Sequence, residues 1–553
     1  MIYLMIQRMG IVRSSLVPAQ ILVAALLSLL TSGIVQAQNP AQPQPNAPLE
    51  LPDFLVTGKA VVDVAAGAKH LPTKPPTFSL SELDSLNPTE KLPPPLAARR
   101  PLPLFSRVDA LVPGYIAIDA GAYLTPSVLA GYSTRSGGYT LDMSGGLEHS
   151  QGWVDGSDYT TAQARLNTSY VAPDKFLFFG KGLTETDIRV RNQSYTLYGD
   201  SAMLGRSSLA LSAAVTTEAK IDSISVVGSF GWSRLGLQTS SNELLTGGAA
   251  TDNALHANVS ATWLGSRIQS AVNADLRMQS LNGDSYSFFE FGYGFRMQML
   301  DWSISASVAP QIASSSDAQD RFGLAVRAVA ETAPWHHSVF RAEVRSGMRS
   351  TSYAELMRIN PYVLDSAVID HAYDLFAARA SLHYTPSMST SLVGSLELRS
   401  TARELVWQDA AGGRFRPSYQ SVTSFRAGLE GAVSLSPRDI LMGEANITSA
   451  VTDSSGQQTY VPLVQATFGY ERMWLPNLRS MISLLYVGQR WTDVANTRSV
   501  DGFIDLRASL SYAVNQTLDV QLIGENLVNS SVFLWNNYRG RGIFVSAGLL
   551  WKF

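Results

Sequence analysis

Residues able to carry out acid–base or metal chemistry are few and dispersed in this chain. Of the seven histidines only His336 and His337 are adjacent, and neighbouring side chains of a strand point to opposite faces, so this pair is poorly placed to share a metal ion. The sequence has no cysteine, and the spacings HExxH, GxSxG, the P-loop and the EF-hand loop do not occur. We therefore predict no catalytic residues, no metal site and no cofactor, and an enzyme is the least favoured functional class. The other histidines are His70, His149, His256, His371 and His383.

Charged residues recur instead on the polar face of segments that are apolar at the alternate positions. Asp275 with Arg277 is one example, and Glu290 with Arg296 is another. A charge facing lipid would cost about 2–4 kcal/mol near the membrane midplane, so we predict that this face lines a hydrated interior. Both signs occur, which does not indicate a filter for cations or anions alone. The predicted interior charges are Asp275, Arg277, Glu290, Arg296, Arg426, Glu430, Asp505, Arg507, Asp519 and Glu525.

Alternation with a period of two dominates residues 114–553. In Phe289–Met299 the odd-numbered residues are large and apolar, whereas the even-numbered ones are Glu, Gly, Gly, Arg and Gln. Successive side chains of a strand point to opposite faces, so each such segment has one apolar and one polar face. About 22 such segments occur, and most reach the ~9–11 residues that a tilted membrane-crossing strand needs. A propeller would show a blade motif every ~40–45 residues, and none is present.

The links between these segments differ in length according to parity. Even-to-odd links are short, whereas odd-to-even links are mostly longer and polar, which is typical of outer-membrane barrels. Closing the sheet leaves no unpaired edge in lipid. The predicted fold is therefore all-β: a transmembrane antiparallel up-and-down β-barrel of about 22 strands, preceded by a Pro-rich irregular N-terminal segment. The long links are predicted at Asn192–Met203, Gln238–Thr251, Ser350–Tyr373, Thr401–Gln420 and Leu527–Arg541.

The first 113 residues have a different composition from the rest. Arg8 and Arg13 precede the apolar run Ile21–Leu30, and small residues follow, which is the pattern of a secretory signal. We predict a signal peptide at 1–37, cleaved between Ala37 and Gln38. Residues 38–113 hold more than half of the 26 prolines and are predicted to form a tether or a reduced plug before the barrel at 114–553. The net charge of −3 provides no basic surface for nucleic acid.

The last fifty or so residues carry a specific pattern. Asn526–Leu527 and Asn529 form an NLxN motif, Gly540–Arg541 precedes the final segment, and that segment ends in the aromatic residues Trp551 and Phe553. This pattern resembles the closing strands of TonB-dependent receptors, and the terminal aromatics resemble the assembly signal of outer-membrane barrels. The resemblance implies a location in the outer membrane of a Gram-negative-type bacterium. It also implies two partners, the lipid bilayer and the barrel-assembly machinery.

A short N-terminal element extends the resemblance. Residues Asp53, Phe54, Leu55, Val56, Thr57 and Gly58 look like the box that precedes the plug of such receptors. There a TonB-type energy transducer pairs with the box by strand addition. The resemblance implies import of a solute, which the sequence does not identify. Residues 38–113 depart from the family, because its folded plug is considerably longer.

Two other functions compatible with a barrel stay open at this stage. One is a passive porin, and the other is a structural or assembly barrel whose lumen is filled by a partner protein. The long link Ser350–Tyr373 contains several apolar residues, and long links are often functional. It is predicted to contact a ligand at the surface or to form a structural cap over the pore.

Overall fold

The computed structural model describes residues 113–174, 180–243, 245–265, 267–299, 301–315, 320–454 and 456–553. The predicted signal segment 1–37 with its Ala37–Gln38 cleavage site, the element Asp53–Gly58 and the Pro-rich residues up to 112 lie outside these ranges and stay predictions. Within the described ranges, no helix is long and apolar enough to cross a membrane.

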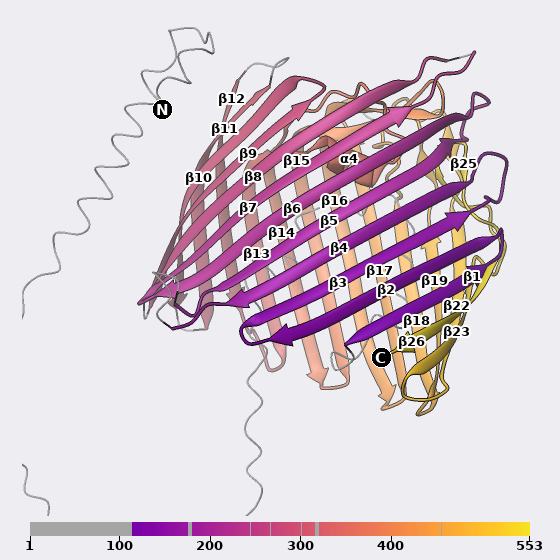
Figure 1. Ribbon diagram of the computed structural model, residues 1–553. Helices are drawn as coiled ribbons and strands as arrows, with labels where there is room; N and C mark the ends of the chain where they lie inside the picture. The colour runs from indigo at the N-terminus through magenta and orange to yellow at the C-terminus, as the bar shows by residue number, and fades with distance from the viewer. Residues whose placement is uncertain are drawn as a thin grey trace, which may run out of the picture. The chain divides into compact units, whose positions relative to one another are not determined.

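Twenty-two antiparallel strands form one closed sheet (Figure 1). Each strand pairs with the next one along the chain, and the last pairs with the first. The first eleven are β1 (Gly114–Gly121), β2 (Thr125–Ser136), β3 (Tyr139–Ser150), β4 (Tyr159–Val171), β5 (Leu183–Leu197), β6 (Leu204–Ile221), β7 (Ile224–Thr239), β8 (Gly248–Leu264), β9 (Ile268–Leu281), β10 (Asp284–Met299) and β11 (Trp302–Ser315). The others are β12 (Arg321–Thr332), β13 (Ser338–Arg349), β14 (Ala372–Ser387), β15 (Thr390–Ala410), β16 (Arg414–Ser436), β17 (Asp439–Thr452), β18 (Val464–Leu475), β19 (Leu478–Val487), β22 (Phe503–Ala513), β23 (Leu518–Glu525) and β26 (Phe544–Lys552).

The seam between β1 and β26 closes the barrel. Tyr115 lies opposite Lys552 at one end of this ladder, and Gly121 lies opposite Ser546 at the other. Every barrel strand therefore has a partner on both sides, which a sheet in lipid requires because no water is present to satisfy free backbone groups. The predicted all-β barrel is confirmed, and each of the 22 strands overlaps one predicted segment.

The strands turn their apolar side chains outward. In β26 the buried residues Phe544 and Leu550 alternate with Val545, Leu549 and Trp551, which are 44%, 50% and 51% exposed. The same alternation leaves large apolar side chains exposed on strand after strand. A continuous exposed apolar belt of this kind is unfavourable in water, whereas lipid tails accommodate it.

The long odd-to-even links carry secondary structure of their own. Link 350–371 contains the helix α4 (Tyr353–Ile359). Link 488–502 contains β20 (Arg490–Trp491) and β21 (Ser499–Val500), and link 526–543 contains β24 (Phe533–Trp535) and β25 (Tyr538–Arg539). These three links and link 453–463 contact one another at one mouth of the barrel, and we call the four links the lid.

The region predicted as a loop at Thr401–Gln420 is mostly strand. β15 and β16 continue through it and are joined only by residues 411–413. The register shifts between Thr401 and Glu404, and the ladder resumes beyond that bulge. This extension lies towards the lid, where no outward apolar face is needed, so the alternation that marks the rest of each strand is weak there.

Candidate functional site

Helix α4 docks the lid onto one wall of the barrel. Ser352 caps the helix in a capping box with Glu355, and Tyr353 and Leu356 are completely buried. A capping box satisfies two free N–H groups at a helix start, which explains why this short helix forms here. The Ala354 N–H donates to Asp252 of β8 at 3.2 Å, and Asp252 also accepts from Gln279 of β9 at 2.7 Å. In Figure 1, α4 is visible between the strands, towards the end with the long links.

Arg206 of β6 holds the segment after the helix. Its guanidinium donates to the carbonyl oxygens of Pro361 and Val363 and pairs with Asp365 at 2.9 Å. The side chain of Arg206 is fully buried. Arg414 of β16 lies 3.6 Å from the same carboxylate. Link 350–371 joins β13 to β14, and β6 lies several strands away from both in the ring. The link therefore extends over the mouth of the barrel, and the tip of β16 meets it beside β6.

The links of the lid share an aromatic core. Tyr362 stacks on Tyr538 with ring centroids 3.5 Å apart, and Tyr460 contacts Trp535 at 4.6 Å. Phe415 at the tip of β16 packs against Trp535 at 4.9 Å. Burial raises the pKa of Tyr460 and of Tyr538 well above the usual tyrosine range, so both phenols stay neutral. The long link predicted as either a ligand-contacting loop or a cap is therefore packed as a cap.

A cavity of about 590 Å³ lies between the lid and the wall formed by β2–β5, β22 and β23. We call it the aromatic chamber, because six of the residues that line it are Trp153, Tyr159, Tyr195, Tyr198, Tyr362 and Tyr538. Its charged lining residues are Arg191, Arg507, Arg541, Glu148, Asp158, Asp505 and Glu525. Rings of this kind offer large apolar area together with polar hydroxyl and indole groups.

Arg541 is a cation of the aromatic chamber that packs against three aromatic rings. Its guanidinium lies 5.3, 5.5 and 4.7 Å from the ring centres of Trp153, Tyr159 and Phe544. It also lies 3.7 Å from Glu148 and 4.0 Å from Glu525. A guanidinium over aromatic faces gains cation–π attraction in addition to its ion pairs. The Gly540–Arg541 motif thus places a cation among rings.

The NLxN motif shapes the start of link 526–543. Asn526 and Asn529 both have a positive φ, 47° and 53°, which asparagine tolerates better than most residues. The Asn526 N–H donates to Asp505 at 2.9 Å, and its side-chain amide donates to the carbonyl oxygens of Ser530 and Arg541. The motif therefore connects the Asp505–Arg507 pair, whose closest atoms are 2.6 Å apart, to Arg541.

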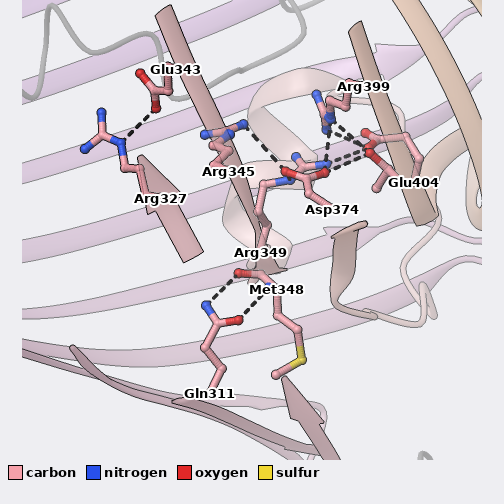
Figure 2. Close-up of polar contacts among 10 residues, drawn as sticks. Gln311, Arg327, Glu343, Arg345, Met348, Arg349, Asp374, Arg399 and Glu404 are labelled. Carbon is pink, nitrogen blue, oxygen red and sulfur yellow. Dashed lines mark hydrogen bonds and ion pairs between the residues drawn. The ribbon is translucent and has the colours of Figure 1, made fainter. Parts of the chain in front are cut away.

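A second, smaller cavity of about 110 Å³ lies under the lid beside β15–β17. We call it the arginine chamber, because Arg399, Arg426 and Arg490 line it with Glu397 and Glu404. Asp374 of β14 and Glu404 of β15 pair with arginines from two strands, β13 and β15 (Figure 2). Asp374 lies 3.1 Å from Arg349, 3.1 Å from Arg399 and 3.5 Å from Arg345. Glu404 lies 2.5 Å from Arg349 and 2.8 Å from Arg399.

Three neighbouring bulges place this ion-pair cluster. The register shifts between Arg345 and Gly347 in β13, between Asp374 and Phe376 in β14, and again at Thr401 in β15. Gly347 has φ 138°, where a Cβ would lie 2.8 Å from that of Ala325. Beside Gly347, the backbone N–H of Met348 donates to the side-chain oxygen of Gln311 at 2.6 Å, and the Gln311 side-chain amide donates to the Met348 carbonyl oxygen at 3.2 Å (Figure 2). Bulges commonly re-aim side chains in this way.

The structure brings some of the predicted interior charges together and leaves others apart. Asp505, Arg507 and Glu525 meet at the aromatic chamber, and Arg426 lines the arginine chamber. The other predicted charges have partners outside the chambers. Asp275 contacts Arg277 at 2.9 Å and His256 at 2.8 Å, Glu290 contacts Gln311 at 2.6 Å, Arg296 contacts Ser303 at 2.9 Å, and Asp519 contacts Lys552 at 2.7 Å. Glu430 stands opposite Glu444 and Val393 in the ladder.

Several residues of the site could not be identified from the sequence. Arg206, Asp365 and Arg490 act through partners in distant links, and no local spacing marks them.

The ring centroids of the C-terminal aromatics Trp551 and Phe553 lie 5.1 Å apart, and their role as an assembly signal stays a prediction. Across the described ranges, no three His, Asp or Glu residues are grouped as metal ligands would be.

Comparison with known proteins gives a likeness at the level of structure. No protein-family model matches the sequence, and no curated protein sequence matches it at a significant level. The FrpB iron transporter of Neisseria meningitidis superposes with a TM-score of 0.66 at 11% identity, over 82% of this chain and 83% of that one. The ferric-catecholate import receptor Fiu of E. coli K12 gives 0.61 at 10% identity, over 80% and 82%. The copper transporter OprC gives 0.63 at 10% identity, over 80% of each chain.

These structures define the class to which the fold belongs. The barrel has the fold of TonB-dependent receptors, so the resemblance inferred from the C-terminal residues is confirmed for the fold. At 10–11% identity the likeness concerns the fold alone.

Proposed function

We propose that this protein is an outer-membrane transport barrel of a Gram-negative-type bacterium that takes up a solute through a gated lumen. The observation that carries the proposal is the lid: one mouth of a ring of 22 strands is covered by links that pack against one another and are tied to β6, to β8 and to the tip of β16. A passive porin works through a standing open channel, and a packed lid argues against it. The fold neighbours are transporters and an import receptor, which also favours transport.

We place the predicted interior charges in the lumen. Asp275 shares its face of β9 with Gln279, which binds Asp252, and Asp252 in turn binds the lid helix. Asp505 and Glu525 line the aromatic chamber together with Tyr362 of the lid. A lumen with charges of both signs is hydrated and suits a polar solute.

The aromatic chamber is the proposed place of first contact with the solute. The fold neighbours are named for iron, a ferric catecholate and copper, so the fold itself does not select one solute. Rings and charges of both signs line this cavity of about 590 Å³, and such a lining favours a solute that has both apolar and polar parts.

The N-terminal residues complete the proposal. We propose that residues 38–113 fill the lumen as a reduced plug and that Asp53–Gly58 pairs with a TonB-type energy transducer by strand addition. Trp551 and Phe553 then serve as the signal for the barrel-assembly machinery. The alternative, a barrel filled by a partner protein, predicts that a protein co-purifies in stoichiometric amount.

Planar-bilayer conductance tests the gated lumen. The purified full chain is expected to show little steady conductance, and a variant lacking residues 38–113 is expected to conduct. Large steady conductance of the full chain would instead establish a passive porin. An unchanged conductance after the deletion would refute the plug, and mass spectrometry of the purified sample would then identify any protein or small molecule that fills the lumen.

A further inference from the structure

Arg490 is a buried cation whose direct contacts among the described residues are with neutral groups. It lies in β20 of the lid, and the residue is 1% exposed. Its two terminal nitrogens donate to the carbonyl oxygens of Leu534, at 3.1 Å, and of Phe533. The ring centre of Phe503 lies 5.7 Å from its guanidinium carbon. The remaining nitrogen, Nε, is buried and has no hydrogen-bond partner in the part of the chain that the structure describes.

This arginine also lacks a carboxylate counterion among the described residues, although the two other buried arginines there each have one. Arg206 pairs with Asp365, and Arg399 pairs with Asp374 and Glu404. Burial lowers the pKa of Arg490 to about 10, so it still carries its charge at neutral pH. A buried charge without a partner is costly, and an anion placed beside it would recover much of that cost.

The space for such an anion adjoins the side chain. Arg490 lines the arginine chamber, a cavity of about 110 Å³, next to Tyr460 and Val461 of the lid. Arg399 and Arg426 line the same cavity against Glu397 and Glu404, so its lining carries one more positive than negative charge. Most of the other lining groups are apolar or aromatic, including Trp407, Val422 and Ala450.

We propose that the arginine chamber binds a small monocarboxylate, with the carboxylate against Arg490 and an apolar or aromatic tail among Trp407, Val422 and Val461. The carboxylate accepts hydrogen bonds from the guanidinium, a charge-assisted contact stronger than one between neutral groups. The apolar and aromatic part of the lining favours an organic acid over inorganic phosphate. The proposal rests on the geometry of this cavity and holds whether or not the barrel imports its solute through the other chamber.

Benzoate binding to the detergent-solubilised full chain, measured by isothermal titration calorimetry, tests the site. Benzamide has the same shape without the charge, and inorganic phosphate has the charge without the tail. We expect benzoate to bind at least about tenfold more tightly than either probe, because charged hydrogen bonds are worth ~1.5–3 kcal/mol. Equal binding of benzamide, tighter binding of phosphate, or no benzoate binding at millimolar concentration would each overturn the proposal.

Three variants locate the site. Arg490→Gln removes the charge and is expected to weaken benzoate binding at least about tenfold, whereas Arg191→Gln removes an arginine from the aromatic chamber and is expected to leave it unchanged. Val461→Trp fills the cavity while keeping Arg490, and it serves if Arg490→Gln fails to fold as judged by circular dichroism and heat-modified gel mobility. Benzoate binding that survives Val461→Trp would place the anion elsewhere and refute the site.

Discussion

The two cavities under the lid differ in size, lining and charge. The aromatic chamber measures about 590 Å³, and its lining includes three arginines and four carboxylates. The arginine chamber measures about 110 Å³, with three arginines and two carboxylates. Link 350–371 stands between them, since Tyr362 lines the first and Ile359 lines the second. One link therefore separates a large ring-lined space from a small cationic one.

This difference follows from how each wall is built. Beside the aromatic chamber the NLxN and Gly-Arg motifs concentrate hydrogen bonds around Asp505 and Arg541. Beside the arginine chamber three bulges in β13–β15 turn arginines towards two shared carboxylates. The same barrel thus produces unlike chambers because irregular backbone replaces regular ladder on only one side.

Replacing Arg206 with alanine should break the separation between the chambers and gives the largest expected effect. It leaves Asp365 buried with the Thr239 hydroxyl and the more distant Arg414, and losing one partner of a buried ion pair costs about 3–5 kcal/mol. We expect faster proteolytic cleavage within 350–371, measured on the detergent-solubilised protein. Arg165→Ala is the matched control, because its pair with Asp187 is half-exposed and should cost under ~1 kcal/mol. Equal cleavage rates in the two variants would contradict the anchoring role.

Replacing Asp374 with asparagine should affect the arginine side alone. Asp374 is 2% exposed and faces Arg345, Arg349 and Arg399, so losing its charge is expected to cost about 2–3 kcal/mol in urea unfolding. Asp505→Asn removes the corresponding charge from the aromatic side, where one arginine, Arg507, pairs with it, and should cost less. A larger loss of unfolding free energy in Asp505→Asn than in Asp374→Asn would show that the Asp374 cluster is not the more strongly paired site.

Replacing Arg541 with lysine changes the aromatic chamber and leaves the arginine chamber intact. Lysine keeps the charge but loses the planar contacts with Trp153, Tyr159 and Phe544, which should cost about 1–2 kcal/mol of unfolding free energy. Because the arginine chamber is untouched, benzoate binding should not change in this variant. A change in benzoate affinity would mean that the two chambers are coupled through the lid.

Acidification is expected to loosen the lid slightly through His371, which adjoins neither chamber. Burial lowers the pKa of this imidazole; Asp370 opposes the shift, and Arg321, Arg403 and Arg277 add to it. The unfolded chain therefore binds the proton at higher pH than the folded one, and stability falls as pH drops below ~6.5 towards the folded pKa. We expect stability to fall between about pH 6.5 and pH 5, seen as faster proteolysis at 350–371. His371→Asn should flatten this dependence, and an unchanged slope would rule His371 out.

The sequence predicted the strands far better than the site. Each wall strand has one face against lipid, so alternation such as that of Phe289–Met299 is a strong local signal. It weakens where β15 and β16 rise towards the lid, and there Thr401–Gln420 was wrongly predicted as a loop. Arg206 and Asp365 are 159 residues apart, and neither stands in a spacing that marks it. Contacts between links depend on how the whole ring places them.

The seam between β1 and β26 has a consequence for biogenesis. The other pairings in the ring join strands that follow one another along the chain, and even their longest links are far shorter than the barrel sequence, so their closure entropy is smaller. The pairing of Tyr115 with Lys552 joins the two ends of the barrel sequence and has no such advantage. Hairpins can therefore form early and independently, while the cylinder stays an open sheet until its last residues arrive. The slow step of maturation should accordingly be the pairing of β1 with β26.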